Sequence, residues 1–255
     1  MTIWVGTSGW QYASWKRRFY PDKLSQREWL AYFSERFPTV EVNNSFYRLP
    51  EESAFERWRK ESAPGFLVTV KASRYITHIK RLADPSDPVK LFWSRARKLG
   101  AKLGPVLFQL PPNFKADLPR LEAFLKVLPR SMRAALEFRE PSWEIEEVHA
   151  ALDRAGAAYV LADRPGWRMG QVVTGGWSYI RLHQGRRTSP FYARSKLRRW
   201  ADRIEQLPAD DVYVYFNNDE LGAAVKDART LMEILEERGL DVARARSRGD
   251  GARSA

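Results

Sequence analysis

The feature that most constrains the fold is a regular alternation of strand-like and helix-like segments, repeated eight times. Eight short runs are rich in β-branched, aromatic and other apolar residues, a composition that favours β-strands. They cover residues 3–7, 39–42, 66–70, 106–108, 134–138, 158–162, 178–182 and 212–216. Longer amphipathic stretches, typical of helices, lie at residues 26–36, 52–61, 86–100, 117–128, 144–155, 193–206 and 220–238. The sixth connection, residues 163–176, is glycine-rich and irregular.

This alternation predicts an α/β fold, a (β/α)8 TIM-type barrel of eight parallel strands. Strand–helix–strand units run parallel through right-handed crossovers, and units of about 30 residues fit a closed barrel better than an open sheet. No Gly-x-Gly-x-x-Gly follows a strand and no Walker-type loop occurs, so the marks of dinucleotide- and nucleotide-binding sheets are missing. We expect one barrel domain over residues 1–240 and a basic, disordered tail over residues 241–255.

Composition narrows the chemistry. The chain has no cysteine, which excludes disulfides, thiolate zinc sites, iron–sulfur clusters and a cysteine nucleophile. Its only histidines are His78, His149 and His183, too few for a cluster of several zinc ions held mainly by imidazoles. There is no apolar run of about 18 residues and no charged, apolar leader at the start. We therefore expect a soluble, cytoplasmic protein without a membrane partner.

The charge is strongly positive, with 43 Lys and Arg against 31 Asp and Glu, a formal net charge of +12. One interpretation is a polyanionic or phosphorylated partner, nucleic acid included. The other is a compositional bias toward arginine, which outnumbers lysine by 31 to 12 and often lies at helical spacing on polar faces. The sequence leaves both interpretations open.

Polar residues follow every predicted strand, and in a TIM-type barrel these carboxyl ends form the active site. In a strand, residues i and i+2 share a face, so Glu137 and Arg139 project together, as do Arg181 and His183. We predict as catalytic Glu41, Lys71, Glu137, His183 and Asp219. We predict as substrate-binding Ser8, Trp10, Tyr12, Asn43, His78, Gln109, Arg139, Trp143, Arg181 and Asn217.

Structural roles compete with these predictions. Glu41 and Glu137 could neutralise nearby cations in a buried ion network, because isolated buried charges are costly. Lys71 could be a residue at the rim, and His183 a structural imidazole. One of the residues 217–219 could be a helix N-cap, a position that Asn and Asp favour.

The first predicted loop, residues 9–21, interleaves aromatic rings with cations. Such a loop can stack a base or a sugar ring and hold a phosphate. It can equally be a packed lid whose rings cover the barrel, and the sequence does not separate the two. Trp143 and Trp167 are further candidates to line the same end of the barrel.

Eight motifs occur in order along the chain. They are Gly6-Thr-Ser-Gly-Trp-x-Tyr, Phe19-Tyr-Pro, Val40-Glu-Val-Asn-Asn-Ser-Phe-Tyr, Val70-Lys-Ala-Ser-Arg-x-Ile-Thr-His, Leu103-Gly-Pro-x-Leu-Phe-Gln-Leu-Pro-Pro, Glu137-Phe-Arg-x-x-Ser-Trp, Tyr179-Ile-Arg-Leu-His and Tyr213-Val-Tyr-Phe-Asn-Asn-Asp. Together they resemble the YecE-like family (DUF72), a domain family of unknown function, over residues 3 to 238. One departure is Gln184, which precedes Gly185 where the family has glycine directly after Arg-Leu-His.

The resemblance implies a TIM-type barrel and no established reaction. Fold alone does not give function. The family's motif positions coincide with the strand-end residues; they fall on Glu41, Asn43, Lys71, His78, Gln109, Glu137, Arg139, Arg181, His183, Asn217 and Asp219.

Three functions fit these residues. The first, which we favour, is an enzyme that acts by acid/base chemistry on a small polar or anionic substrate, phosphorylated or sugar-like; whether it is a hydrolase, lyase or isomerase stays open. Lys71, Arg139 and Arg181 would bind the anionic group. Glu41 or Glu137 would transfer protons. The second is a nucleic-acid-binding or phosphodiester-processing protein, and the third a non-catalytic protein that binds a small anion.

No cofactor is implied by these residues. A divalent metal such as Mg²⁺ or Mn²⁺ is a further alternative, because such ions prefer oxygen ligands. Its ligands would come from Glu41, Glu137, Asp163 and Asp219 with His183, in competition with the neighbouring Lys and Arg side chains for the carboxylates.

Overall fold

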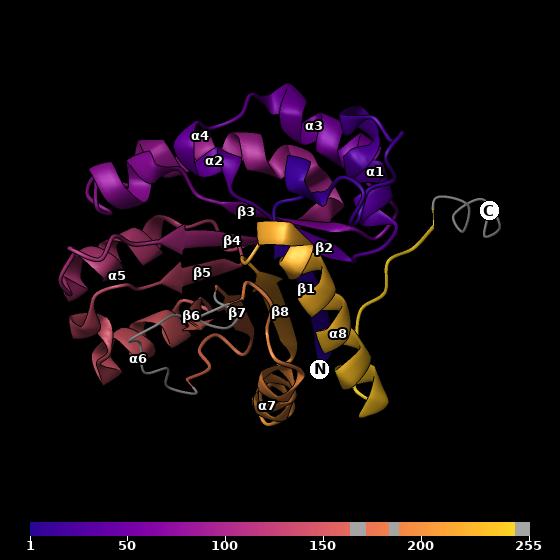
Figure 1. Ribbon diagram of the computed structural model, residues 1–255. Helices are drawn as coiled ribbons and strands as arrows, with labels where there is room; N and C mark the ends of the chain where they lie inside the picture. Colours follow the sequence, from indigo (N-terminus) through magenta and orange to yellow (C-terminus); the bar gives the residue numbers. More distant parts are fainter. Residues whose placement is uncertain (164–171, 184–188, 248–255) are drawn as a thin grey trace, which may run out of the picture.

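The strands close into a single barrel. In the computed structural model, which describes residues 1–163, 172–183 and 189–247, eight parallel strands pair in sequence order and β8 pairs with β1 (Figure 1). The strands are β1 (Thr2–Ser8), β2 (Thr39–Val42), β3 (Leu67–Lys71), β4 (Leu103–Gln109), β5 (Ala134–Glu137), β6 (Ala158–Asp163), β7 (Ser178–Leu182) and β8 (Asp211–Phe216). This topology confirms the predicted TIM-type fold.

Helices connect the strands and lie outside the barrel (Figure 1). They are α1 (Trp29–Ser34), α2 (Asn44–Tyr47), α3 (Glu52–Glu61), α4 (Ser86–Ala96), α5 (Leu118–Val127), α6 (Glu146–Arg154), α7 (Arg194–Glu205) and α8 (Ala223–Glu237). The predicted ranges differ from these mainly where 3-10 turns replace helix ends, at Gln26–Glu28, Arg97–Lys102 and Glu220–Gly222. Shorter segments are the 3-10 turns Ala13–Trp15 and Pro141–Trp143 and the π-helical turn Tyr75–Ile79.

Strand β4 is longer than predicted. The sequence indicated residues 106–108 because Gly104 and Pro105 usually interrupt strands. In the structure both residues belong to β4, and the pairing register between β3 and β4 shifts between Val68 and Val70. This irregularity accommodates a proline that has no N–H for the sheet.

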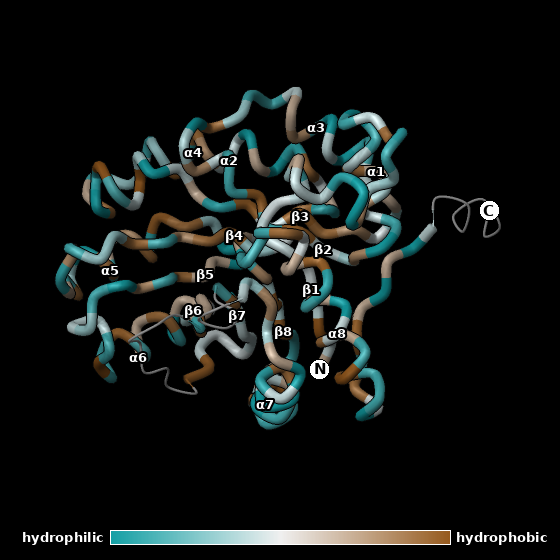
Figure 2. The backbone as a smooth tube through the Cα atoms, in the orientation of Figure 1, coloured by the Kyte–Doolittle hydropathy of each residue, from teal (hydrophilic) through white to brown (hydrophobic). Residues whose placement is uncertain are grey.

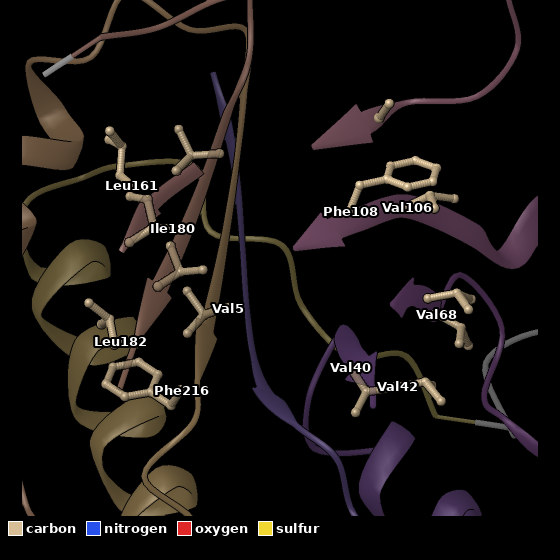
Figure 3. Packing of buried hydrophobic residues seen from close by; sticks show 14 of the residues in the cluster. Val5, Val40, Val42, Val68, Val106, Phe108, Leu161, Ile180, Leu182 and Phe216 are labelled. Atoms are coloured by element: carbon tan, nitrogen blue, oxygen red, sulfur yellow. The ribbon is translucent and has the colours of Figure 1, made fainter. Parts of the chain in front are cut away.

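The two faces of the strands form two separate cores. Outward side chains pack under the helices, among them Val5, Val40, Phe108, Ile180 and Phe216 (Figure 3). Strands β3 and β4 are accordingly brown in Figure 2, whereas the visible turns of α7 are mostly teal. Inward side chains fill the barrel as a second cluster, which comprises Leu107, Ala135, Ala158, Val160, Trp177, Tyr179, Tyr213 and Tyr215 with Trp4 and Leu67 against it. The barrel is therefore a packed core.

One glycine permits this inner packing. A Cβ on Gly6 of β1 would lie 2.2 Å from the carbonyl oxygen of Thr39, a distance that no side chain tolerates. The phenol of Tyr215 lies in the same layer, 2.8 Å from Oγ1 of Thr39 and 2.7 Å from Oγ1 of Thr69. A buried tyrosine in this layer therefore has its hydroxyl satisfied.

The chain after α8 returns to the first strand. β1 pairs with β2 only from Gly6 to Ser8, so the beginning of β1 has a free edge. Residues 241–243 cover that edge: the Ile3 amide donates to the Asp241 carbonyl at 2.8 Å, and the Ala243 amide donates to the Ile3 carbonyl at 2.9 Å. Val242 is buried there. Residues 241–243 of the predicted tail thus pack against the barrel, residues 244–247 follow without regular secondary structure, and residues 248–255 lie outside the described residues.

Part of the predicted sixth connection also lies outside the described residues, with Trp167 in it, and so does the Gln184–Gly185 turn. In residues 172–177 the structure has a bridge between Thr174 and Trp177 and no helix. Across the described ranges, no helix has both the length and the apolar character needed to cross a bilayer.

Candidate functional site at the carboxyl end of the barrel

The carboxyl ends of the strands bring six predicted site residues together. Parallel pairing sets Ser8 beside Glu41 and Gln109 beside Glu137. All members are buried, and we call them the mouth cluster: Ser8, Glu41, Lys71, Gln109, Glu137 and Arg181. Three more candidates contact this cluster or one another: Arg139, His183 and Asn217. His78 lies close enough for the charge of Lys71 to act on it.

Arg181 holds the two carboxylates of the cluster. Its Nε and Nη2 donate to Glu41 at 2.9 and 2.7 Å, a bidentate pair, and its Nη1 donates to Glu137 at 2.6 Å. Arg139 adds a second cation, with Nε 2.8 Å from Oε1 of Glu137. This arrangement is the buried ion network that the sequence left open.

The ion network keeps both carboxyl groups ionised. Burial by itself raises the pKa of Glu41, but Arg181 and the hydroxyl hydrogen bonds from Ser8 and Tyr179 outweigh it and leave the pKa below its usual value. Burial likewise raises the pKa of Glu137, and the charges of Arg181 and Arg139 bring it well below the usual value. Neither group is suited to act as a general acid near neutral pH.

The same contacts correct the predicted role of Arg181. Each of its three nitrogens donates to a carboxylate, and the residue is 1% exposed, so the guanidinium is turned to Glu41 and Glu137 and away from an external anion. Ser8 and Gln109 are also engaged within the cluster. Ser8 donates to Glu41, and the Gln109 amide donates to Glu137 at 2.9 Å. These three residues position the carboxylates.

The amine of Lys71, at the end of β3, is in direct contact with two neutral groups. Its Nζ donates to Oε1 of Gln109 at 2.7 Å and lies 4.1 Å from the centre of the Phe46 ring. Burial and the positive charge of Arg181 lower the pKa of Lys71 to about 8, against the opposing effect of the two glutamates. An amine with such a pKa is partly uncharged near neutral pH.

His183 follows β7 and has one satisfied nitrogen. Nδ2 of Asn217 donates to its Nδ1 at 3.0 Å, which places the proton of the neutral ring on Nε2. Nε2 is buried without a hydrogen-bond partner, 4.0 Å from Oε1 of Glu137. Burial and the charge of Arg181 lower the pKa of His183 to about 4, so the ring is neutral at physiological pH.

His78 belongs to the π-helical turn after β3. Its Nδ1 is 2.9 Å from Oγ1 of Thr77, and its ring meets the Phe46 ring edge-on with centroids 4.9 Å apart. Burial and the charge of Lys71 lower the pKa of His78 to about 4. Phe46 therefore packs between an amine and a neutral imidazole.

Asn43 and Asp219 have less contact with the cluster. Oδ1 of Asn43 is buried without a partner. The side chain of Asp219 is half-buried, and burial raises its pKa. Tyr12 donates its hydroxyl to the Ser8 carbonyl, and burial and the charge of Asp219 raise its pKa. Asp219 occupies the N-cap position of the 3-10 turn Glu220–Gly222, as the capping alternative predicted, but its side chain makes no capping hydrogen bond there.

The aromatic candidates do not face a ligand. Trp143 is completely buried, stacked on Phe138 with its Nε1 donating to the Phe114 carbonyl. Trp10 is 4% exposed and meets Trp58 of α3 edge-on. These contacts correct the prediction that both rings bind substrate.

The first loop is a packed lid. Trp15, Phe19 and Tyr20 are buried in the outer core, and the loop cations Lys16 and Arg17 pair with Asp22. Rings packed in a core have no face for a base or a sugar. The structure therefore favours the lid interpretation of this loop over a stacking platform for nucleic acid.

Three of the carboxylates predicted as metal ligands bind other side chains. Glu41 and Glu137 are bonded to Arg181, while Asp163 accepts hydrogen bonds from Tyr192 at 2.8 Å and Lys196 at 2.7 Å. Among residues 1–163, 172–183 and 189–247, no three His, Asp or Glu side chains are grouped so as to hold a metal ion.

Two residues of the site were missed. Tyr179 is buried in the barrel and donates its hydroxyl to Oε2 of Glu41 at 2.6 Å. The alternation of β7 carried that signal, because Tyr179 shares a face with Arg181. Phe46 contacts both Lys71 and His78, and no periodicity in its short helix indicated this.

Comparisons with known proteins agree with this fold. A family model described as "Protein of unknown function DUF72" matches residues 4–250. The UPF0759 protein YunF of Bacillus subtilis is 27% identical over 273 aligned residues, which cover 92% of this chain and 95% of that protein. These matches confirm the resemblance of the motifs.

Solved structures match along most of the chain. The crystal structure of a DUF72 family protein from Thermotoga maritima has a TM-score of 0.83 at 27% identity, covering 92% of this chain and 100% of that one. A DUF72 family protein from Enterococcus faecalis has a TM-score of 0.78 at 18% identity, covering 92% of this chain and 95% of that one, and so bears on the fold alone.

Proposed function

The chain belongs to the DUF72 family of proteins of unknown function, and from the geometry of its mouth cluster we propose that it is an enzyme. Its substrate is a small polar molecule with an anionic group, bound at the carboxyl end of the barrel. The reaction is acid/base chemistry carried by Lys71 and Asp219, with His183 as a hydrogen-bond donor.

The observation that carries this proposal is the unsatisfied nitrogen of His183. Buried polar atoms almost always have hydrogen-bond partners, since an unmade bond costs roughly 1–3 kcal/mol. Nε2 of His183 has none, and Oδ1 of Asn43 at the same end has none either. A bound molecule with both an acceptor and a donor would satisfy these two atoms.

The charges around His183 favour an anion. Arg139 is the more exposed of the two arginines on Glu137, with 30% of its side chain accessible against 2% for Arg181. Its remaining N–H groups can donate to a carboxylate or a phosphate. Lys71 adds a further positive charge whenever it is protonated.

Proton transfer falls to Lys71 and Asp219 in this proposal, and the Nε2–H of His183 donates a hydrogen bond to the substrate. Glu41 and Glu137 are held ionised by Arg181 and serve to fix its position and the field around the site. The pKa of Lys71, about 8, lies close to neutral pH, where an acid/base group works best. The half-buried Asp219, with a raised pKa, is a candidate acid.

Thermal-shift and calorimetric titrations with phosphate, glycerol 3-phosphate and glyoxylate test the binding site. We expect at least one of them to bind, and Arg139→Met and His183→Ala to weaken that binding roughly tenfold each, the value of one charged hydrogen bond. The matched controls are Arg133→Met at the opposite end of the barrel and His149→Ala on α6, which should bind like the wild type. Equal losses in the controls, or no binding by the wild type, would contradict the proposal.

The same titrations separate the alternative functions. Conversion of the bound compound that is lost in His183→Ala supports an enzyme, whereas binding without conversion supports a non-catalytic anion-binding protein. A short oligonucleotide at low salt tests the nucleic-acid alternative, which requires binding that falls steeply as salt is added.

A further inference from the structure

Resting on the proposed function, we propose that Lys71 is a nucleophile that forms an imine with the carbonyl carbon of its substrate. The substrate class is then a small aldehyde or ketone that also carries a carboxylate or a phosphate. The proposal follows from the position of the amine, its partners and its contrast with the other lysines of the chain.

Lys71 is a buried amine without a counterion in contact. Its hydrogen-bond partner is the neutral amide of Gln109, and the face of Phe46 covers another side. Within the described residues, no carboxylate lies within 4.0 Å of Nζ, although Glu41 and Glu137 belong to the same cluster. Both carboxylates are instead turned to arginine. The ring face of Phe46 and the oxygen of Gln109 favour the ammonium form, but burial away from water outweighs them and disfavours it.

Charged groups at the ends of three other strands act on Lys71. Arg181 on β7 and Arg139 after β5 disfavour its protonation, while Glu41 on β2 and Glu137 on β5 favour it. With burial added, the balance brings the pKa to about 8. At pH 7.5 roughly a quarter of the molecules then carry an uncharged Lys71, against about a thousandth for an ordinary lysine.

Other lysines of the chain lack this combination. Nζ of Lys98 is 2.8 Å from Glu52, and Nζ of Lys196 is 2.7 Å from Asp163. Lys102 is partly buried but donates to the carbonyls of Arg59 and Ser62 and to the Ser62 hydroxyl. Lys98 and Lys196 thus contact a carboxylate and Lys102 has three hydrogen-bond acceptors, whereas Lys71 contacts one neutral acceptor and an aromatic ring.

The chemistry needs no further reactant. The lone pair of Nζ forms a bond to the carbonyl carbon, and the π electrons of the C=O bond move to oxygen, which takes up a proton as the nitrogen loses one. A second proton transfer from nitrogen to that oxygen releases water and leaves the C=N bond. The protons pass between nitrogen and oxygen directly or through solvent water. The Nε2–H of His183 can donate a hydrogen bond to the carbonyl oxygen, and Arg139, with part of its side chain exposed, can hold the anionic group.

Reductive trapping tests the proposal on the wild-type protein. The protein is incubated at pH 7.5 with glyoxylate and cyanoborohydride, which converts an imine into carboxymethyl-lysine, and each of the 12 lysines is quantified by peptide mapping. We expect the adduct at Lys71 to exceed that at any other lysine by roughly tenfold or more, as its larger amine fraction predicts. Glycolaldehyde, an aldehyde without the anionic group, should show a smaller preference.

The outcomes separate this inference from the proposed function. Glyoxylate that binds but labels the lysines evenly overturns the imine and leaves the anion site standing. If glyoxylate neither binds nor labels Lys71 selectively, the imine and the anion site are both contradicted. Lys71→Arg keeps the charge without the nucleophile; a folded variant with the same total labelling as the wild type would also contradict the proposal.

Discussion

Both ends of the barrel hold an arginine paired with acidic side chains, yet the two ends are built differently. At the amino end, Arg133 pairs with Asp211 at 2.7 Å, donates to the Tyr213 hydroxyl and lies over the Trp177 ring. Its side chain is 40% exposed. At the carboxyl end, Arg181 is 2% exposed and binds two carboxylates that are fully buried.

We interpret the difference as a structural role for the charges at the amino end and a functional role for those at the carboxyl end. The amino end uses one half-exposed ion pair and aromatic packing, beside a cavity of about 460 Å³ lined in part by Leu103, Met132 and Tyr213. The carboxyl end buries several charges and leaves His183 and Asn43 with unpaired atoms. Burying charges is a poor route to stability, and the proposed function would give these charges a chemical role at the end where TIM-type barrels carry their active sites.

The largest effect should come from removing the arginine at each end in turn. Arg181→Met leaves two buried carboxylates without their partner, and we expect it to lower the free energy of unfolding by about 3–5 kcal/mol. Arg133→Met breaks a half-exposed pair and a cation–π contact, and we expect a loss of about 1–2 kcal/mol. Urea denaturation of the two variants measures the difference.

A triple variant tests whether the loss of stability in Arg181→Met comes from unpaired charge or from disruption of the fold. If the loss in Arg181→Met comes from unpaired charge, adding Glu41→Gln and Glu137→Gln should recover most of it, because a neutral network replaces a broken ionic one. A triple variant as unstable as Arg181→Met, or equal losses at the two ends, would count against the comparison.

The sequence was sufficient for the barrel and for the identity of most of the cluster. Period-two alternation in the strands and right-handed crossovers leave few topologies, and the strand ends then bring Glu41, Glu137 and Arg181 to one place. The sequence could not predict which partner each charged side chain binds. That Arg181 takes both carboxylates and leaves Lys71 to Gln109 depends on differences of about an ångström among side chains of five strands.

The aromatic residues are a second case in which the sequence predicted a position in the chain but not the contacts made there. Trp10 and Trp143 lie just after strands, as substrate-stacking rings do, but their direction is set by packing against Trp58 and Phe138. Which face of a loop turns inward is decided by the neighbours it meets in three dimensions, and those neighbours are distant in sequence.

A second, smaller effect concerns pH. The pKa of His183 is about 4 in the folded protein against an ordinary 6.5, so the unfolded chain takes up this proton at a higher pH than the folded chain. Above pH 6.5 the ring is neutral in both the folded and the unfolded chain, so burying it carries no protonation penalty. As the pH falls from 6.5 toward 4, protonation of the unfolded chain lowers the free energy of unfolding. We expect His183→Asn to reduce the loss of stability between pH 6.5 and 4.5 by about 2 kcal/mol.

Urea midpoints measured across that range test this prediction. The control is Arg133→Met, which lowers stability at the other end but removes no group that titrates there, so its slope should equal that of the wild type. The window stops at pH 4.5 because Glu41 and Glu137, whose pKa values are lowered by Arg181, affect stability only below it. An unchanged slope in His183→Asn would mean that the ring is accessible to protons in the folded state.

The smallest effect on stability should come from the unpaired polar atoms at the two ends. Ser178, at the start of β7, has a buried hydroxyl without a partner, as Asn43 has a buried carbonyl oxygen. Replacing either by alanine removes a desolvated group, so we expect the free energy of unfolding to stay within about 0.5 kcal/mol or to rise. Only Asn43→Ala should weaken anion binding in calorimetry. If Ser178→Ala weakened binding as much, the unpaired atoms would not distinguish a functional end from a structural one.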